Sequence, residues 1–279
     1  MPELAEVEYY RKQWMPAAGE LVRDVQLNRG KRVFRETDVA SLSRGLMGQR
    51  LERLLRHGKQ MCFVFGEAHW LGVHLGMTGR ILLGEQDYQR RPHDHLVLVT
   101  ESGRSLVFND PRMFGRIRYG FGAEEPFWWT DLPPEPLDEA FTPERFSFYL
   151  SRRPATPIKA FLLMQDYFPG IGNWMADEIL WRARIKPTVP AGNLGKYKQR
   201  KLFLTIQEVC RDALRVIGTD WARPPNSWLF NHRWKPGGFC PRTGGRLRRK
   251  VVGGRTTCWS PEWQIYGGKR LTSTVASAS

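Results

Sequence analysis

Residues 61–75 read Met-Cys-Phe-Val-Phe-Gly-Glu-Ala-His-Trp-Leu-Gly-Val-His-Leu. Two runs rich in aromatic and β-branched residues flank a break that contains glycine, which is typical of two strands joined by a turn. Similar runs at residues 21–27, 95–99 and 105–108 are again separated by Gly, Asp or Asn and extend the pattern over residues 20–120. Many short strands with little helix predict an antiparallel β-sandwich or barrel-like domain.

Helical patterns lie on both sides of these strands. Over residues 3–14, one side of a short helix would carry Leu4, Val7 and Tyr10 or Arg11. A shorter helix is marked by Ala176, Leu180 and Ala183. A longer one, which Gly218 is placed to end, follows the spacing i, i+4, i+7, i+11, i+14 at Leu202, Ile206, Val209, Ala213 and Val216. The predicted fold class is therefore α+β, with a β-sandwich first and a helical domain second.

The changes of pattern and composition also predict the domain boundaries. A stretch dense in Pro separates the strand-rich half from the helical half, and a region rich in Gly and Arg that follows the helices is typical of a hairpin. We expect a β-sandwich domain, a linker, a helical domain, a finger hairpin and a disordered tail at residues 1–122, 123–138, 139–233, 234–270 and 271–279.

The charge is distributed unevenly between the two halves. The chain has 43 Lys+Arg and 28 Asp+Glu, a formal net charge of +15. Residues 1–138 hold 19 basic and 19 acidic side chains, so residues 139–279 hold 24 basic and 9 acidic ones and carry the whole excess. Since solubility needs only a modest charge of either sign, this surplus indicates a polyanionic partner, most often nucleic acid.

Composition excludes several classes of protein. The 41% hydrophobic and 25% charged residues are ordinary for a globular chain and rule out collagen, coiled coil and bulk disorder. No apolar run approaches the length of a membrane span, and the charged start lacks the apolar centre of a secretory signal. The four cysteines have no disulfide-framework spacing. A cytoplasmic protein is expected, associated with the nucleoid if the source is a bacterium.

The first residues carry the clearest chemistry. The chain begins Met-Pro-Glu-Leu-Ala-Glu-Val. Removing Met1 would expose the secondary amine of Pro2, and an α-amino group titrates at about pH 7.7–8.0, so it is a nucleophile near neutrality. Attack on a sugar C1′ would give a cationic iminium, with Glu3 and Glu6 close enough to act as acid or base. The alternative is a helix that simply starts with Pro.

Two loops carry apolar residues at strand ends. In His74-Leu-Gly-Met-Thr-Gly-Arg80, two glycines bracket Met77, and in Asn109-Asp-Pro-Arg-Met-Phe-Gly-Arg116, Asp-Pro starts a turn. Arg112 and Phe114 point the same way if this segment is extended. Exposed Met and Phe could wedge into a base stack and fill the space of an extruded base. The alternative is that both belong to the core.

Two glycine-containing turns offer phosphate contacts. Lys59, in the turn Arg56-His-Gly-Lys-Gln60, could reach a phosphate as a point charge, or could be a solvated turn lysine. In Pro169-Gly-Ile-Gly-Asn173, glycines followed by an Asn cap could present backbone N–H groups to an anion at a helix start. The alternative there is an ordinary connection between two helices.

The segment 239–264 is similar to a zinc ribbon without its ligand pairs. A four-cysteine zinc site needs two close Cys pairs, and neither Cys240 nor Cys258 has a partner two or three positions on. We predict no zinc, no other metal and no cofactor. Residues 240–270 still carry eight basic residues against the single acid Glu262, namely Arg242, Arg246, Arg248, Arg249, Lys250, Arg255, Lys269 and Arg270. This charge favours contact with phosphates.

Taken together, in this order and spacing, these segments resemble the formamidopyrimidine-DNA glycosylase/endonuclease VIII family over about residues 2–266. The resemblance implies a β-sandwich, a helix–two-turns–helix domain and a zinc or zincless finger. It also implies a bifunctional glycosylase and abasic-site lyase of base excision repair, which forms a Schiff base and cuts by β,δ-elimination. The partner would be double-stranded DNA with oxidised bases or abasic sites, and the protein is expected to be a monomer without membrane contact.

The resemblance also assigns roles to residues. Pro2 becomes the nucleophile, Glu3 the acid for sugar-ring opening and Glu6 a supporting carboxylate, with Lys59 in the same catalytic group. Contacts to the DNA backbone or lesion strand fall on His74, Lys159, Asn173 and Arg255. The side chains that fill the void left by the extruded base are Met77, Arg112 and Phe114.

Departures from the family pattern affect the finger and the lesion. An alignment on Arg255 and Gln264 puts Ser260 and Trp263 where the second cysteine pair belongs, and Thr243 replaces the partner of Cys240, so the finger resembles the zincless variant. Ala5 replaces the second Pro usual in the purine-specific branch. The start of the chain favours purine lesions such as 8-oxoguanine and formamidopyrimidine, whereas the short segment before the finger favours pyrimidines or a broader range.

Two further functions stay open on the sequence alone. One is a non-catalytic binder of damaged DNA, which would have no use for Pro2, Glu3 and Glu6. The other is an RNA- or ribosome-associated basic protein, which predicts comparable affinity for structured RNA. Salt dependence alone does not separate them, because both would bind phosphates.

Overall fold

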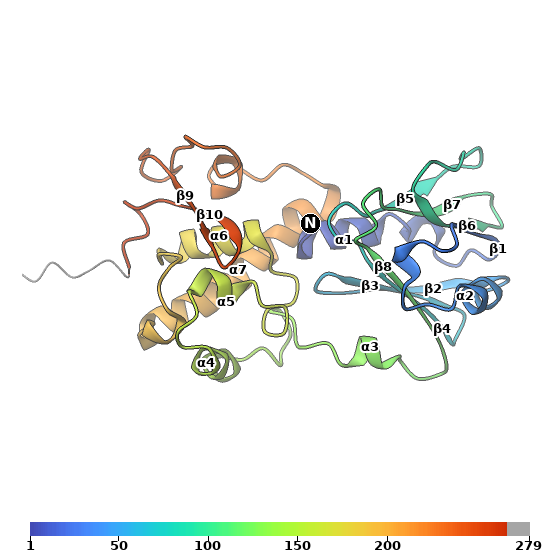
Figure 1. The fold of residues 1–279 in the computed structure, drawn as a ribbon, viewed down its shortest axis with the longest axis horizontal. Helices are drawn as coiled ribbons and strands as arrows, with labels where there is room; N and C mark the ends of the chain where they lie inside the picture. Colours follow the sequence, from blue (N-terminus) through green and yellow to red (C-terminus); the bar gives the residue numbers. More distant parts are fainter. Residues whose placement is uncertain (267–279) are drawn as a thin grey trace, which may run out of the picture. The chain divides into compact units, whose positions relative to one another are not determined.

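The computed structural model describes residues 1–266 (Figure 1). The predicted tail, 271–279, lies outside the described residues. The chain forms two compact units whose segments are not contiguous. The first unit, which we call the sandwich unit, comprises Met1–Phe141, Met164–Gly172 and Gln207–Pro224, and the remaining residues form the second, or helical, unit.

The sandwich unit contains the two antiparallel sheets that the strand pattern predicts. One sheet has the order β1-β6-β7-β5, formed by Val22–Leu27, Asp94–Thr100, Ser105–Asn109 and Arg80–Gly84. The other has the order β2-β3-β4-β8, formed by Leu51–His57, Gln60–Phe65, His69–His74 and Arg116–Phe121. Each strand pairs antiparallel with its neighbour, so the predicted antiparallel β-sandwich is confirmed.

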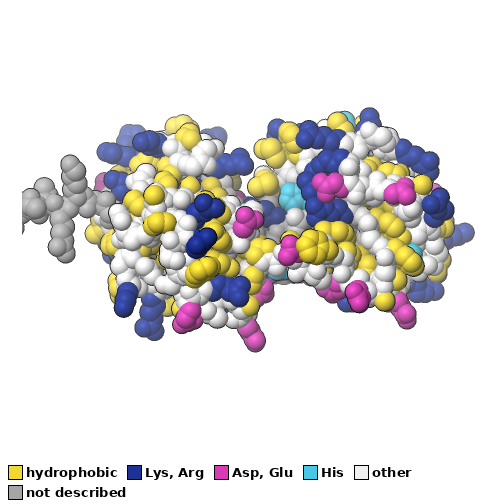
Figure 2. Space-filling view, turned by 60° about the horizontal axis from the view of Figure 1, so that its bottom comes forward, with side chains coloured by type: hydrophobic (Ala, Val, Ile, Leu, Met, Phe, Trp, Pro, Cys, Tyr) yellow, Lys and Arg dark blue, Asp and Glu magenta, His cyan; other side chains and the backbone are white. Residues whose placement is uncertain are grey.

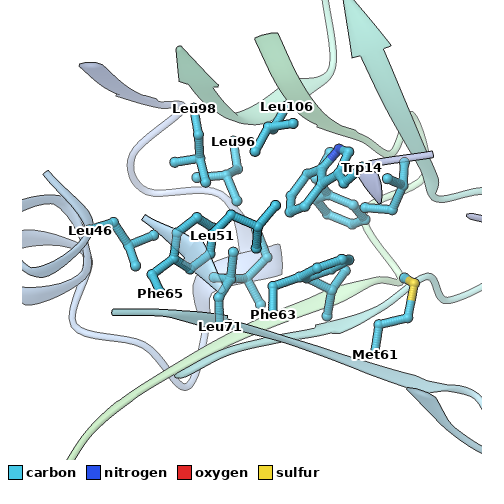
Figure 3. Packing of buried hydrophobic residues seen from close by; sticks show 14 of the residues in the cluster. Trp14, Leu46, Leu51, Met61, Phe63, Phe65, Leu71, Leu96, Leu98 and Leu106 are labelled. Carbon is cyan, nitrogen blue, oxygen red and sulfur yellow. The ribbon is translucent and has the colours of Figure 1, made fainter. Parts of the chain in front are cut away.

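The core of this unit lies between the sheets. Phe63 and Leu71 from one sheet and Leu96 and Leu106 from the other belong to one buried cluster (Figure 3). Trp14 enters the same cluster, with its ring 4.3 Å from that of Phe63. Its indole N–H donates to the carbonyl of Leu82 across 3.0 Å, so the one polar atom of this buried ring is satisfied.

Helices close the ends of the sandwich. α1 spans Leu4–Lys12 and buries Leu4, Ala5 and Val7, as the apolar spacing predicts. α2, Val39–Leu46, was not expected, although it carries an apolar stripe and Asp38 caps it by accepting from the amide of Ala40. The short elements η1, η2 and α3 lie at Met15–Ala17, Arg32–Phe34 and Phe127–Thr130.

The long helix α7 runs from Lys196 to Asp220 and so belongs to both units. The prediction that Gly218 ends it is wrong. Gly218 lies inside the helix, where a Cβ would come within 3.3 Å of Glu8 and 3.4 Å of the Ala5 carbonyl, so glycine permits close packing against α1. The helix ends at Trp221, which adopts a positive φ of 61° and packs against Tyr9 at 4.8 Å.

The helical unit holds the finger, the helix predicted around residues 176–183, and two helices that were not predicted individually. Those two are α4, Pro143–Arg152, and α5, Ile158–Leu162. The predicted helix is α6, Asn173–Ala183, and the short elements η3 and η4 span Ala191–Asn193 and Leu229–His232. The finger is a hairpin of β9, Arg248–Val252, and β10, Arg255–Trp259. Gly253 and Gly254 form its turn with φ of 59° and 72°, a conformation that glycine adopts without strain. No helix among the described residues is long and apolar enough to cross a membrane.

Candidate active site

Three segments of the sandwich unit meet at the start of the chain. The amide of Leu4 donates to the carbonyl of Gly170 across 3.0 Å, which joins the N-terminus to the loop 168–172. The β2–β3 turn approaches the same loop, since a Cβ on Gly58 would lie 2.8 Å from Cβ of Pro169. Gly170 has a φ of 91°, which favours glycine at this crossing. Glycine is therefore required for the three segments to meet.

Glu3 lies at the centre of this meeting point. It is 3% exposed, and its Oε2 accepts the amide proton of Gly172 across 2.9 Å. Its own amide donates to Oε2 of Glu6 across 3.1 Å, one half of a capping box at the start of α1. Pro2, half-buried, directly precedes Glu3, and Met1 is exposed. Two carboxylates thus flank the position from which the Pro2 nitrogen would act once Met1 is removed.

Lys59 belongs to the same site. It is 7% exposed, and its ammonium donates to the carbonyl of Ile171 across 2.9 Å. The alternative of a solvated turn lysine is therefore wrong. Glu135 holds the turn that carries it, because its carboxylate accepts the amide of Gly58 at 2.6 Å and pairs with Arg56. The bond to Ile171, next to Gly172, places this cation close to the N-terminal segment that contains Glu3.

The loop 168–172 does not present free amides to an anion. The amide of Gly170 donates to the Gln165 side chain, that of Ile171 to the carbonyl of Phe168, and that of Gly172 to Glu3. The expected phosphate clamp is therefore wrong at these three positions, because protein acceptors already use the N–H groups. The loop instead positions Glu3 and Lys59.

The two void-filling loops expose the side chains that the resemblance assigns to them. Met77 is 41% and Phe114 43% exposed, so the alternative that both belong to the core is wrong. The guanidinium of Arg112 lies 4.9 Å from the Phe114 ring, in cation–π range. Between them Met113 turns inward against the core with a positive φ of 55°, which lets its two neighbours share one face.

Asp110 ties these two loops together. It is fully buried, and Oδ1 accepts from the hydroxyl of Thr78 at 2.8 Å while Oδ2 accepts from the amide of Gly115 at 2.7 Å. The loops also pack backbone to backbone, because a Cβ on Gly76 would lie 2.4 Å from the carbonyl carbon of Phe114. From the sequence Asp110 was predicted only to start a turn, and its bond to Thr78, 32 residues away, gave no signal there.

A local basic cluster surrounds His74, although the first half of the chain is neutral overall. Arg116 pairs with His74 across the sheet and forms an ion pair with Glu36, as does Arg118. Arg35 donates to the carbonyl of Gly115 across 2.9 Å. Figure 2 shows Lys and Arg side chains gathered on this unit, at the right. These arginines were missed because they lie in two separate parts of the sequence, at residue 35 and at 116–118, and both are distant from His74 along the chain.

Burial, followed by the charges of Lys59 and Arg116, lowers the pKa of His74 to about 4. Its Nδ1 accepts the amide proton of Gly76 across 3.1 Å. At neutral pH this side chain is therefore uncharged, and only Nε2 is left to donate. A contact of His74 with DNA would be a neutral hydrogen bond rather than an ion pair.

The helical unit carries the other three predicted contacts. Lys159 is fully buried, and its ammonium donates to Asp177 and to the carbonyl of Asn173, each across 2.6 Å. The side-chain amide of Asn173 donates to the carbonyl of Thr256 across 2.9 Å. Arg255, at the start of β10, is exposed. In this structure Arg255 is therefore open to solvent, whereas the Lys159 ammonium is engaged inside the unit.

The finger is packed around side chains rather than cysteine pairs. Cys240 is buried with Trp181, Leu229, Leu247 and Cys258. Desolvation acts to raise the pKa of Cys240, but hydrogen bonds from Thr243 and Trp181 and a contact with Ser260 leave it lowered. Three of the four positions that the alignment put at the zinc site thus meet in space. The indole of Trp263, the fourth, donates to the Trp181 carbonyl at 2.9 Å.

Comparison with known proteins agrees with this geometry. Residues 1–117 match the family model of the formamidopyrimidine-DNA glycosylase N-terminal domain, and residues 132–222 match that of its H2TH domain. A formamidopyrimidine-DNA glycosylase of Thermus thermophilus is 36% identical over 96% of this chain and 100% of its own length. One of Arabidopsis thaliana is 29% identical over 96% of this chain and 72% of its own.

Solved structures give the same answer. The Fpg (MutM) of Lactococcus lactis, in complex with DNA that contains N7-benzyl-Fapy-dG, is 27% identical with a TM-score of 0.84, and the match covers 94% of this chain and 99% of that one. A MutM structure with DNA containing carbocyclic 8-oxo-G is 28% identical with a TM-score of 0.83 and the same coverage. The fold and site define a DNA glycosylase with a helix–two-turns–helix domain. The chain belongs to the formamidopyrimidine-DNA glycosylase family.

Proposed function

We propose that this protein is a bifunctional DNA glycosylase and abasic-site lyase that excises oxidised bases from double-stranded DNA in base excision repair. The observation that carries the proposal is the convergence of the N-terminus, Lys59 and the loop 168–172, which brings a buried carboxylate and a buried ammonium to the segment that begins with Pro2. A pure DNA binder has no need for this arrangement.

In the proposed reaction the free Pro2 nitrogen attacks C1′ of the damaged nucleotide and displaces the base. A secondary amine bonded to C1′ of an opened sugar can only become an iminium, which withdraws electrons and so promotes loss of the 3′ and then the 5′ phosphate. Glu3 supplies a proton for ring opening, and Glu6 supports the site from the first turn of α1. Met1 must be removed first, because Pro2 has no free amine while Met1 is attached.

The remaining predicted residues would bind the DNA. Met77, Arg112 and Phe114 fill the void left by the extruded base, and their shared exposed face supports this. His74, Lys159, Asn173 and Arg255 are proposed to contact the lesion strand, with Arg255 the best placed as an exposed cation. Cytoplasmic location and a monomeric state are proposed with this function.

Oxidised purines are proposed as the preferred lesions, in line with the Fapy-dG and 8-oxo-G named for the DNA of the structural neighbours. A cleavage panel of duplexes with one 8-oxoguanine, one oxidised pyrimidine or one abasic site tests this. Faster cleavage of the pyrimidine lesion would reverse the preference without affecting the chemistry. Binding without cleavage on any of the three would leave the non-catalytic binder.

The nucleophile is tested by borohydride trapping on abasic DNA. The protein is made with a removable N-terminal extension that ends directly before Pro2. We expect no covalent adduct while the extension is present, and an adduct on the peptide that begins with Pro2 once it is cleaved off. Lys59→Met is the matched control for the neighbouring amine and should still be trapped. Trapping that is independent of the extension would reject Pro2 as the nucleophile.

A further inference from the structure

Asp177, which no motif pointed to, is a buried charge that joins several segments of the helical unit. It lies on α6, is 1% exposed, and accepts four hydrogen bonds. Lys159 donates to Oδ1 at 2.6 Å. Arg233 donates to Oδ2 through two nitrogens, at 3.0 and 2.6 Å, and the amide of Cys258 donates to the same oxygen at 3.0 Å.

These donors come from separate segments. Lys159 lies on α5, Arg233 directly follows η4, and Cys258 lies on β10 of the finger. One carboxylate therefore joins α5, α6, the end of η4 and the finger. Buried ions are tolerated only when they are paired and hydrogen-bonded, so removal of this carboxylate would take an ion-pair partner from two buried cations.

The bond to Cys258 fixes the finger in register on α6. β10 pairs with β9 on one edge, and the Cys258 amide turns to Asp177 on the other. Two residues earlier, the carbonyl of Thr256 accepts from the side chain of Asn173, on the first turn of α6. The hairpin turn also meets α5, because a Cβ on Gly253 would lie 2.5 Å from Cβ of Ala160.

The same network includes all three DNA contacts that were predicted in the helical unit, Lys159, Asn173 and Arg255. Besides Asp177, the ammonium of Lys159 holds the carbonyl of Asn173 at 2.6 Å. Arg255 starts the strand whose fourth residue is held by Asp177. The orientation of Asn173 and of Arg255 therefore depends on the buried carboxylate, although Asp177 has no surface of its own with which to meet DNA.

We propose that Asp177 is a positioning residue that holds this metal-free finger against the helices and thereby aligns Arg255 and Asn173 for the DNA backbone. The DNA part of this inference rests on the function proposed above, whereas the part that concerns the finger does not. A buried carboxylate with several donors favours one arrangement of the segments that carry them, because another arrangement would break charged hydrogen bonds in the interior.

The test compares Asp177→Asn with Glu178→Gln. Glu178 is the matched control, since it is the next residue of α6, is also fully buried, and accepts from the amide of Phe230 at 3.1 Å and from Arg182. Among the described residues, these partners lie on α6 and η4 and not in the finger. Three quantities are measured on the full chain: hydrogen exchange of residues 248–259, Kd for a duplex with an uncleavable abasic analogue, and the single-turnover cleavage rate at saturating enzyme.

For Asp177→Asn we expect faster exchange in the finger and a Kd raised by about tenfold, the size typical for losing a charged hydrogen-bond partner, with a cleavage rate within a few-fold of wild type once the DNA is bound. Glu178→Gln should lower Tm but keep the exchange of the finger and the Kd of wild type. Equal effects of both variants on the finger, or unchanged exchange in Asp177→Asn, would overturn the proposal.

If Asp177→Asn does not fold, Arg233→Lys replaces it, because lysine keeps the charge but loses the two-nitrogen contact with Oδ2. A smaller change of the same kind in exchange and Kd is then expected, and no change at all contradicts the proposal. If the wild type neither binds nor cuts abasic DNA, the proposed function fails, but hydrogen exchange still decides whether Asp177 holds the finger.

Discussion

Asp110 and Thr78, 32 residues apart in the chain, are joined by a hydrogen bond of 2.8 Å from the threonine hydroxyl to a buried carboxylate. Through its other oxygen Asp110 also holds the amide of Gly115. The loop that carries Met77 and the loop that carries Arg112 and Phe114 are therefore held as one body. Asp110, which is itself buried, therefore fixes the shape of the exposed face that would fill the space of an extruded base.

Asp110→Asn should weaken this connection, because an amide NH2 would face at least one of two N–H or O–H donors. We expect kcat/KM on a lesion duplex to fall by about tenfold, the equivalent of one lost hydrogen bond. Cleavage of a single-stranded abasic substrate should be unchanged, since it has no opposite base and leaves no void to fill. Thr78→Val should act in the same direction, and the exposed Asp87→Asn should do nothing. Equal losses on both substrates would assign Asp110 to folding alone.

Glu3→Gln distinguishes the proposed role of Glu3 as a proton donor from its structural role as a hydrogen-bond acceptor. Glutamine keeps an oxygen that can accept from Gly172, so the meeting of the N-terminus with the loop 168–172 should survive. Ring opening, and with it strand cleavage of a lesion duplex, should slow by at least about 100-fold, the usual contribution of a general acid. Borohydride trapping on abasic DNA should be largely retained, because the sugar of an abasic site opens to the aldehyde without an enzyme. Glu8→Gln is the control on the same helix, and its pair with Arg11 is structural. Unchanged cleavage of the lesion duplex by Glu3→Gln contradicts the proposed role.

Gly172→Ala tests whether the close approach of the loop 168–172 to Glu3 is needed for activity. The added Cβ would lie 2.2 Å from the carboxyl carbon of Glu3, so the carboxylate or the loop must move. Because displacement of a reacting group by about 1 Å can cost about 100-fold, we expect a loss of that size in cleavage rate. Gly195→Ala is the control, since its nearest neighbour is 4.0 Å away. Far-UV circular dichroism shows whether the variant is still folded; a folded and fully active Gly172→Ala protein would contradict the model of the site.

His74 should make the protein less stable in acid. The pKa of His74 is lowered from its usual value of 6.5 to about 4 in the folded chain. As the pH falls, the unfolded chain therefore binds the proton of this side chain before the folded chain does. The contribution of His74 to stability is therefore full above about pH 6.5 and is lost as the pH falls towards 4, by at most about 3 kcal/mol. The free energy of unfolding of His74→Gln should fall less steeply than that of wild type between these pH values. Parallel curves would contradict this pKa.

Local pattern predicted the elements well. The runs rich in aromatic and β-branched residues predicted β1, β3, β4, β6 and β7, and the spacing of Leu202 through Ala213 predicted the buried stripe of α7, because side-chain period depends only on neighbours along the chain. No run was assigned to β2, β5 or β8. Local pattern failed where a contact with a residue distant in the sequence determines the structure. Gly218 was read as a stop, but α1 packs against it and the helix continues for two more residues.

The residues of the site could be predicted from the sequence, but the hydrogen bonds between them could not. The motifs named Glu3, Lys59, Met77 and Phe114, and the structure places the first two at one crossing and exposes the other two. That the amides of the loop 168–172 are already used was not predictable, because the acceptors lie elsewhere in the chain. Asp177 gave no signal, since one acidic residue in a helix looks the same whether it is solvated or buried.

The order of the segments along the chain has a consequence for synthesis. The sandwich unit needs Met164–Gly172 and Gln207–Pro224, which the ribosome delivers long after the last strand of the sheets. Ile171 and Gly172, the partners of Lys59 and Glu3, are therefore absent when the sheets first emerge. The nascent chain must keep its N-terminus open until about three-fifths of the protein has been made, and a fragment ending near Phe141 would contain both carboxylates and no assembled site.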